Sequence, residues 1–307
     1  MPPLPKLLVS SVVRGANQGD SHGGVYIVDL ENETFEQRVD WNDCGIDFGG
    51  RGADRGLRGI VVHGDEIFVA ASDELFVFDR NFKVVGSYRN PYLKHCHEIS
   101  EHRGSLYLTS TGFDSILRFD LATRRFNLGL QLLDTAGRFS ARIYDPLATG
   151  GPAPSVQFHL NSVYANDSGI FVCGLKLPAL VRMTPQSVDA VAELPSGTHN
   201  ARPFRNGVLL NDTEADSLVL FLPNRLISIP VPKYAREDLL NAEADESGVA
   251  RQGFGRGLCV ISETLVAGGS SPTTVSLYDL SKEQRVKSVN ITMDMRNAAH
   301  GMAIWPF

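Results

Sequence analysis

The sequence predicts an all-β fold, a six-bladed β-propeller closed by pairing of the N- and C-terminal segments in one blade. Two observations predict it: a four-strand unit recurs about every forty residues, and one unit is split between the two ends of the chain. The length of 307 residues and a hydrophobic content of 43% suffice for a large core. We expect residues 1–307 to form a single domain.

The repeat is clearest between residues 56 and 90. Short runs rich in β-branched and aromatic residues occupy 57–62, 66–72, 74–79 and 83–88, with turns between them. Four such runs form one antiparallel sheet. The same cadence returns after four further opening residues, which are His97, His159, His199 and Arg256.

The sixth unit is divided between the termini. Residues 300–305 look like a first strand with nothing after it, whereas 7–11, 24–30 and 34–39 look like a second, third and fourth strand without a first. We therefore expect Met302, Ala303 and Ile304 to pair with residues 7–11. Such closure protects the edges of an open array, and an open β-sandwich would not explain the split.

Two insertions lengthen the repeat. Residues 135–155 are rich in Gly, Pro and Ala and predict an irregular loop, and residues 234–252 predict a short helix within 236–243. Both precede an innermost strand, so we expect both on the same face as a partial lid, since long loops in compact domains are often functional.

The innermost strand of each blade lines the propeller axis, so residues at the starts of these strands should converge. Four of the chain's eight histidines and two arginines stand there, in the ring order His300, Arg58, His97, His159, His199 and Arg256. Two alternatives stay open, because a shift of one residue reverses the direction of a side chain. Leu160 could take the place of His159, and His95 could take that of His97.

Three interpretations of this ring follow. In the first, His97, His159, His199 and His300 bind one divalent metal ion, Fe, Mn, Zn or Cu, as neutral imidazoles. In the second, the polar side chains only tie neighbouring blades together through backbone carbonyls and buried water. In the third, a histidine moves a proton without a metal.

Other polar residues near the strand starts extend the predicted site. We expect catalytic roles for His300, Glu98 and Lys176, with Glu98 also suited to fix a histidine tautomer. Forked guanidinium donors suit a carboxylate or phosphate. The predicted substrate-binding residues are Arg58, Arg256, Asn161, Asn200 and Arg202.

Composition narrows the partners. A formal net charge of -6 and a pI of about 5.8 argue against nucleic acid or an anionic membrane, which select basic patches. We find no apolar run long enough for a transmembrane helix and no secretory signal. Four dispersed cysteines form no CxxC pair. These features predict a cytoplasmic protein, and the arginines Arg58 and Arg256 predict a small, anionic molecule as its substrate.

Five short motifs carry a resemblance to a known family. They are Cys96-His97-Glu98-Ile99, His159-Leu160-Asn161-Ser162-Val163, His199-Asn200-Ala201-Arg202-Pro203, Arg256-Gly257-Leu258 and His300-Gly301-Met302. The chain resembles the uncharacterised bacterial propeller family called domain of unknown function 4915 over nearly its whole length. Ser162 departs from the glycine expected after His-Leu-Asn. The resemblance implies the fold and no settled activity.

The function predicted first is therefore a metal-dependent enzyme, an oxygenase or a lyase, whose histidine-rich site on the propeller axis acts on a small anionic or polar substrate. The alternative is a non-catalytic ligand-binding or interaction propeller with a structural polar channel. A third prediction is a metal-free lyase, hydrolase or isomerase that uses His and Arg.

Overall fold

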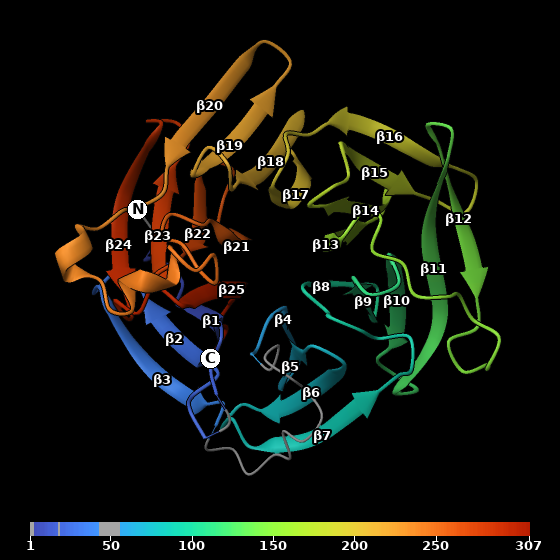
Figure 1. The fold of residues 1–307 in the computed structure, drawn as a ribbon, viewed down its shortest axis with the longest axis horizontal. Coiled ribbons are helices and arrows are strands. Elements are labelled where there is room, and N and C mark those ends of the chain that lie inside the picture. The colour runs from blue at the N-terminus through green and yellow to red at the C-terminus, as the bar shows by residue number, and fades with distance from the viewer. Residues whose placement is uncertain (1–2, 18, 43–55) are drawn as a thin grey trace.

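Six antiparallel sheets stand around one central axis in the computed structural model, which describes residues 3–17, 19–42 and 56–307 (Figure 1). This confirms the six-bladed propeller. The first blade joins both termini and contains, from the axis outward, β25 (Asn297–Ile304), β1 (Leu7–Val13), β2 (Gly24–Asp29) and β3 (Thr34–Asp40).

The other blades follow the chain, each beginning with its innermost strand. The second contains β4 (Ile60–His63), β5 (Glu66–Ala71), β6 (Glu74–Asp79) and β7 (Val84–Arg89). The third contains β8 (Ile99–His102), β9 (Ser105–Ser110), β10 (Ser115–Asp120), β11 (Arg125–Thr135) and β12 (Arg138–Tyr144). The fourth contains β13 (Leu160–Asn166), β14 (Gly169–Gly174), β15 (Ala179–Met183) and β16 (Val188–Glu193).

The last two blades have the same plan. The fifth contains β17 (Thr198–Phe204), β18 (Gly207–Asp212), β19 (Ser217–Leu222) and β20 (Arg225–Pro230). The sixth contains β21 (Arg256–Val260), β22 (Leu265–Ser270), β23 (Thr274–Asp279) and β24 (Gln284–Asn290). Two 3-10 turns, η1 (Arg236–Asp238) and η2 (Ala242–Ala244), lie between them. None of the helices in the described part of the chain has the length and apolar character that a membrane span requires.

The ring closes as the split repeat predicts. In β25, Ile304, Ala303 and Met302 pair with Leu7, Leu8 and Val9 of β1. The innermost strand of the first blade therefore comes from the far end of the sequence (Figure 1).

The core is divided among the interfaces between neighbouring blades, with one apolar cluster at each of the six. Between the first and second blades, Trp41 is fully buried and packs edge-on against Phe76, with ring centroids 4.9 Å apart. The ring excludes water between its blades and leaves polar strand starts near the axis. Burial of this kind is the main favourable contribution to folding.

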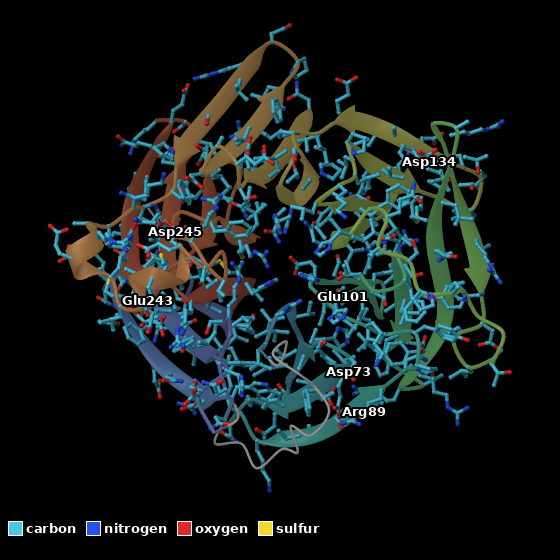
Figure 2. All side chains as sticks on the ribbon, viewed as in Figure 1. Asp73, Arg89, Glu101, Asp134, Glu243 and Asp245 are labelled. Carbon is cyan, nitrogen blue, oxygen red and sulfur yellow. The ribbon has the colours of Figure 1, made fainter. Side chains whose placement is uncertain are left out.

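The two insertions differ from their predicted forms. Residues 135–155 are not simply an irregular loop, because β11 runs to Thr135 and β12 returns from Arg138. Ala136 and Gly137 between them both have positive φ, the geometry of a turn that matches strand twist. Asp134 of this hairpin lies at the rim (Figure 2), so the hairpin forms no lid over the axis. The helix expected within 236–243 is reduced to η1 and η2.

Candidate functional site

Five blades place a histidine or arginine at or just before the start of the innermost strand or within it: His199, Arg256 and His300 lie in β17, β21 and β25, and Arg58 and His97 stand two residues before β4 and β8. The strand registers pair His199 with Asn211 and Arg256 with Gly269. In the fourth blade, Leu160 takes the corresponding position opposite Gly174. The alternative alignment of that unit is therefore the correct one, and His159 stands one residue earlier. A left-handed φ of 52° at His159 changes the chain direction there, and its ring still reaches the cluster.

The innermost strands bulge where these residues stand. The register shifts by one residue in four blades, between Val9 and Ser11, Leu160 and Ser162, His199 and Arg202, and Arg256 and Leu258. A bulge re-aims a side chain. The strands also approach closely, since a Cβ on Gly301 would clash with the carbonyl oxygen of Arg58.

Two arginine–histidine pairs form the centre of the site. The Nη1 atom of Arg58 lies 3.0 Å from Nε2 of His97, and Nη1 of Arg256 lies 2.7 Å from Nε2 of His300. A guanidinium can only donate, so both Nε2 atoms accept and the ring proton is on Nδ1. In His97 this proton faces the carbonyl oxygen of His95 at 2.7 Å. The rings of His97 and His300 are 5.7 Å apart, which brings the two pairs together.

The other two histidines stand beside these pairs. The His159 ring lies 5.5 Å from that of His97. His199 donates from Nδ1 to the carbonyl oxygen of Gly197 at 3.0 Å, which leaves a lone pair on Nε2. Among the described residues, no hydrogen bond to this Nε2 atom is found. His199 is therefore a buried imidazole with a fixed tautomer and an available basic nitrogen.

Burial keeps these imidazoles neutral. Desolvation, followed by the charges of nearby arginines, holds the pKa values of His97, His199 and His300 well below the ordinary 6.5. The pKa of His159 is lowered by the same causes. Desolvation also lowers the pKa of Arg58 to about 10, and it lowers that of Arg256, with further repulsion from Arg14 and Arg58. The site thus combines neutral imidazoles with buried guanidinium groups that repel one another.

Three further residues of the cluster were not predicted. Arg14 follows β1, Arg251 belongs to the second insertion, and Phe254 lies between that insertion and β21. The three guanidiniums of Arg14, Arg251 and Arg256 lie 5.0, 5.0 and 4.5 Å from the Phe254 ring centroid. Arg251 and Phe254 stand five and two residues before Arg256 in the sequence, so proximity to a predicted site residue was the available signal. No such signal marks Arg14.

Glu98 lies in a buried network that ties three blades. Its Oε2 accepts from Nδ2 of Asn200 at 2.5 Å, and Oδ1 of Asn200 accepts from Nδ2 of Asn211 at 3.0 Å and from the Gly257 amide at 3.1 Å. Burial raises the pKa of Glu98 to about 7. Backbone carbonyls fix the tautomers of His97 and His199, and a part for Glu98 in fixing a histidine tautomer stays a prediction.

Three other predicted residues contact neighbouring blades or solvent. Asn161 donates to the carbonyl oxygen of Thr198 at 3.0 Å. Arg202 donates to that of Leu258 at 3.1 Å and stacks over Tyr164. The contacts of Asn161 and Arg202 therefore join neighbouring blades, as the second interpretation of the ring expects. Lys176 is exposed on the turn after β14, where its charge helps to lower the pKa of His159.

The axial histidines are not arranged as the predicted metal site requires. Within the described ranges, no group of three or more His, Cys, Asp or Glu side chains is arranged to hold a metal ion. The Nε2 lone pairs of His97 and His300 already accept hydrogen bonds from arginines. A divalent cation here would have to displace two guanidiniums of its own charge sign. The residues as arranged do not fit a metal, and metal binding stays a prediction.

A hollow of about 1300 Å³ lies away from the axis. It runs between the third and fourth blades, along the β11–β12 hairpin and the turn between β15 and β16. None of the described residues that line it is a predicted site residue.

Comparisons with known proteins identify the fold alone. No family model matches the chain, and no curated protein matches its sequence. The structure is similar to a chain of the nidogen/laminin complex, with 8% sequence identity, coverage of 97% of each chain and a TM-score of 0.60. At such identity the likeness shows a propeller and no activity. The resemblance to domain of unknown function 4915 stays a prediction.

Two other solved structures also have a similar fold. A catalytically inactive variant of virginiamycin B lyase from Staphylococcus aureus, determined with quinupristin, shares 10% identity over 89% of this chain and 80% of that chain, with a TM-score of 0.50. The computationally designed Ika8 protein shares 8% identity over 93% of this chain and 89% of that chain, with a TM-score of 0.50.

Proposed function

We propose that the protein is an enzyme that binds a small organic anion at the axis and abstracts a proton from it. The observation that carries the proposal is the proximity of the neutral imidazole of His199, whose tautomer is fixed, to the guanidinium of Arg256. The positive charge of Arg256 lowers the pKa of the His199 imidazole. Both side chains also contact the Phe254 ring. A base and an anion-binding group thus lie against the same aromatic ring.

The guanidinium of Arg256 supports the binding role. It is oriented by its hydrogen bond to His300 and by the Phe254 ring beneath it. Hydrogen bonds from a guanidinium to a carboxylate are among the stronger ones in proteins. A carboxylate bound here would also receive charge stabilisation from Arg58, which pairs with His97 on the adjacent blade.

His199 supplies the chemistry in this proposal. Its Nε2 lone pair takes a proton from the carbon next to the bound carboxylate or a neighbouring carbonyl. The imidazole becomes imidazolium, and the electron pair of the broken C–H bond moves into the enolate. The arginines stabilise the negative charge that develops, which is the usual source of rate enhancement in such reactions. A lyase or an isomerase results, depending on where the electron pair goes next.

The experiment measures exchange of a substrate proton with solvent, so the product of the natural reaction need not be known. Small 2-oxo and 2-hydroxy carboxylic acids are incubated with the protein in D2O, and loss of the signal of the exchangeable C–H is followed by proton NMR. We expect exchange with at least one acid. His199→Asn should reduce the rate by about 10²- to 10⁴-fold, the usual contribution of a general base, with anion binding retained.

Two outcomes would contradict the proposal. Binding with no exchange would leave a non-catalytic ligand-binding propeller, and exchange that persists in His199→Asn would assign the base elsewhere. His102→Asn is the matched control, since that histidine pairs with Asp167 on the surface at 3.2 Å and is remote from the axial cluster.

A further inference from the structure

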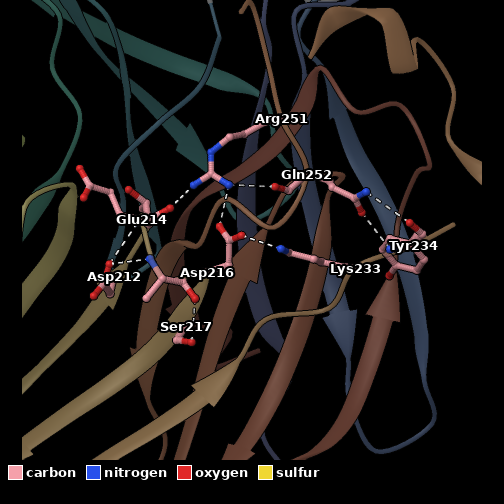
Figure 3. A network of polar contacts seen from close by, with 10 residues as sticks. Asp212, Glu214, Asp216, Ser217, Lys233, Tyr234, Arg251 and Gln252 are labelled. Atoms are coloured by element: carbon pink, nitrogen blue, oxygen red, sulfur yellow. Dashed lines mark hydrogen bonds and ion pairs between the residues drawn. The ribbon is translucent and has the colours of Figure 1, made fainter. Parts of the chain in front are cut away.

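Residues 233–255, which contain the second insertion and extend it at both ends, form a strap that the carboxylate of Asp216 helps to fasten. Asp216 receives Nζ of Lys233 at 2.7 Å and Nη1 of Arg251 at 2.6 Å (Figure 3). The other end of the Arg251 guanidinium donates to the carbonyl oxygen of Thr213. Tyr234 is held by a hydrogen bond of 2.8 Å to Thr274. The strap is therefore built into the fold and fixes the place of Phe254.

Three arginine side chains from different parts of the chain lie around the Phe254 ring. Arg251 and Arg256 belong to the strap and the sixth blade, and Arg14 comes from the first blade, where its amide donates to the carbonyl oxygen of Arg296 at 3.0 Å. The ring face is a site that guanidiniums favour. An aromatic ring does not neutralise charge, however, so it brings three cations together without cancelling them.

Within the described part of the chain, the charges beside Phe254 do not balance. Asp216 is shared by Arg251 and Lys233, and among the described residues no carboxylate lies within ion-pair distance of Arg14 or Arg256. The Nε atom of Arg256 is buried without an acceptor. Each imidazole of the cluster is neutral, so none adds to or offsets the sum. Arg14 and Arg256 are therefore two cations with no protein counter-charge in the described structure.

We propose that the ligand of the axial site carries at least two negative charges, one held by Arg256 and the second by Arg14 beside Phe254. This rests on the anion-binding part of the proposed function. A ligand with one charge would leave one guanidinium without a counterion. Two charges match the two cations, either on one phosphate or on two carboxylates. Arg14 is then a specificity-determining residue that selects dianions over monoanions.

Calorimetric titration of the full chain separates these cases. The probes are succinate, its monoanionic analogue monomethyl succinate, and inorganic phosphate, in a cationic buffer at pH 7.5 and low salt. We expect succinate or phosphate to bind at least tenfold more tightly than monomethyl succinate. Arg14→Gln should weaken dianion binding at least tenfold and change monomethyl succinate binding less than twofold. Arg256→Gln should weaken every probe that binds.

The choice of tight probe identifies the source of the two charges: phosphate indicates a phosphate ester, and succinate indicates a dicarboxylate. Equal affinity for mono- and dianions, with no effect of Arg14→Gln, would overturn this inference and leave the proposed function intact. If the wild-type protein bound none of the three probes, that result would instead contradict the proposed function.

A measurement without ligand keeps the inference testable. In a low-salt cationic buffer without phosphate or carboxylates, Arg14→Gln should raise Tm because it removes repulsion among the guanidiniums, and added phosphate or succinate should stabilise the wild type more than the variant. Arg225→Gln is the matched control, since Arg225 is exposed and paired with Glu283 on the outer strands. A lower Tm for Arg14→Gln would show that its charge is already compensated.

Discussion

The two insertions of this chain begin alike and end differently. Each follows the outermost strand of a regular blade and precedes an innermost strand, yet the β11–β12 hairpin extends a sheet at the rim, whereas the strap delivers Arg251 and Phe254 to the axis. The hairpin continues an apolar alternation at Leu130 and Leu132 and turns at Gly137. The strap has no such pattern and adds no strand to a blade, and besides its side-chain contacts it makes a few backbone hydrogen bonds, such as those of Leu240 with Met293 and Met295.

The comparison shows that the position of an insertion in the repeat does not decide where its side chains lie in the fold. A segment that can add a strand satisfies its backbone hydrogen bonds within the sheet and stays at the edge. A segment that cannot must find partners elsewhere, and this strap finds backbone partners at Met293, Met295 and Ser271. Its side chains add contacts to Asp216 and Thr274. The strap is thus free to carry functional side chains.

The largest effect is expected from opening the ring, on which both insertions depend. Deleting the last ten residues removes most of β25 and exposes the whole length of β1. We expect no cooperative thermal transition by circular dichroism. Replacing residues 134–139 with Asn-Gly, which only shortens the rim hairpin, should leave a cooperative transition. An unchanged transition in the truncated chain would contradict ring closure by the termini.

The next effect is the dependence of stability on pH, which tests the axial cluster. The folded pKa values of His97, His199 and His300 lie well below the unfolded 6.5, so the unfolded chain binds more protons below pH 6.5. Stability should fall as pH drops below 6.5, by about 1.4 kcal/mol per pH unit for each such histidine. Urea unfolding at several pH values in a buffer without small anions measures this.

Glu98 acts in the opposite sense. Its folded pKa of about 7 lies above the ordinary 4.5, so its contribution is present at low pH and is lost as pH rises towards 7. One carboxyl is outweighed by three histidines. A urea midpoint that does not change between pH 7.5 and 5.5 would show that the imidazoles are not held neutral. His199→Asn should make the dependence less steep.

A smaller effect should distinguish the fastenings of the two insertions. Asp216→Asn leaves Arg251 and Lys233 without their carboxylate and should cost about 1–3 kcal/mol, with weaker anion binding. The matched change in the hairpin is Asp134→Asn, which alters an exposed acceptor of the Gly137 amide and should stay within about 0.5 kcal/mol. Equal effects on stability and on anion binding would remove the distinction.

The smallest effect is expected from chelation. The two arginine–histidine pairs use the Nε2 atoms that a metal would need, so EDTA should shift Tm by less than roughly 1 °C, because a ligand that is not bound cannot stabilise. Metal analysis of the purified protein provides the second measurement. One equivalent of a divalent ion, lost together with stability on chelation, would restore the metal site predicted from the histidines.

The sequence determined the architecture by itself. The repeat and its split at Met302 predicted the blades and their closure, because period-two strands and turn residues are local signals. It also predicted that His97, His199, His300 and Arg256 would meet, since repeated blades bring equivalent positions to one axis. The Ala136-Gly137 turn was a readable hairpin signal that the glycine-rich composition obscured.

Only the tertiary structure decided what the meeting residues do. That Arg256 donates to His300 depends on angles between blades, and no local pattern encodes these. Arg14 and Phe254 come together from the first blade and the strap, far apart in sequence. Desolvation then makes the imidazoles neutral, because burial is a property of the assembled ring and not of any one segment.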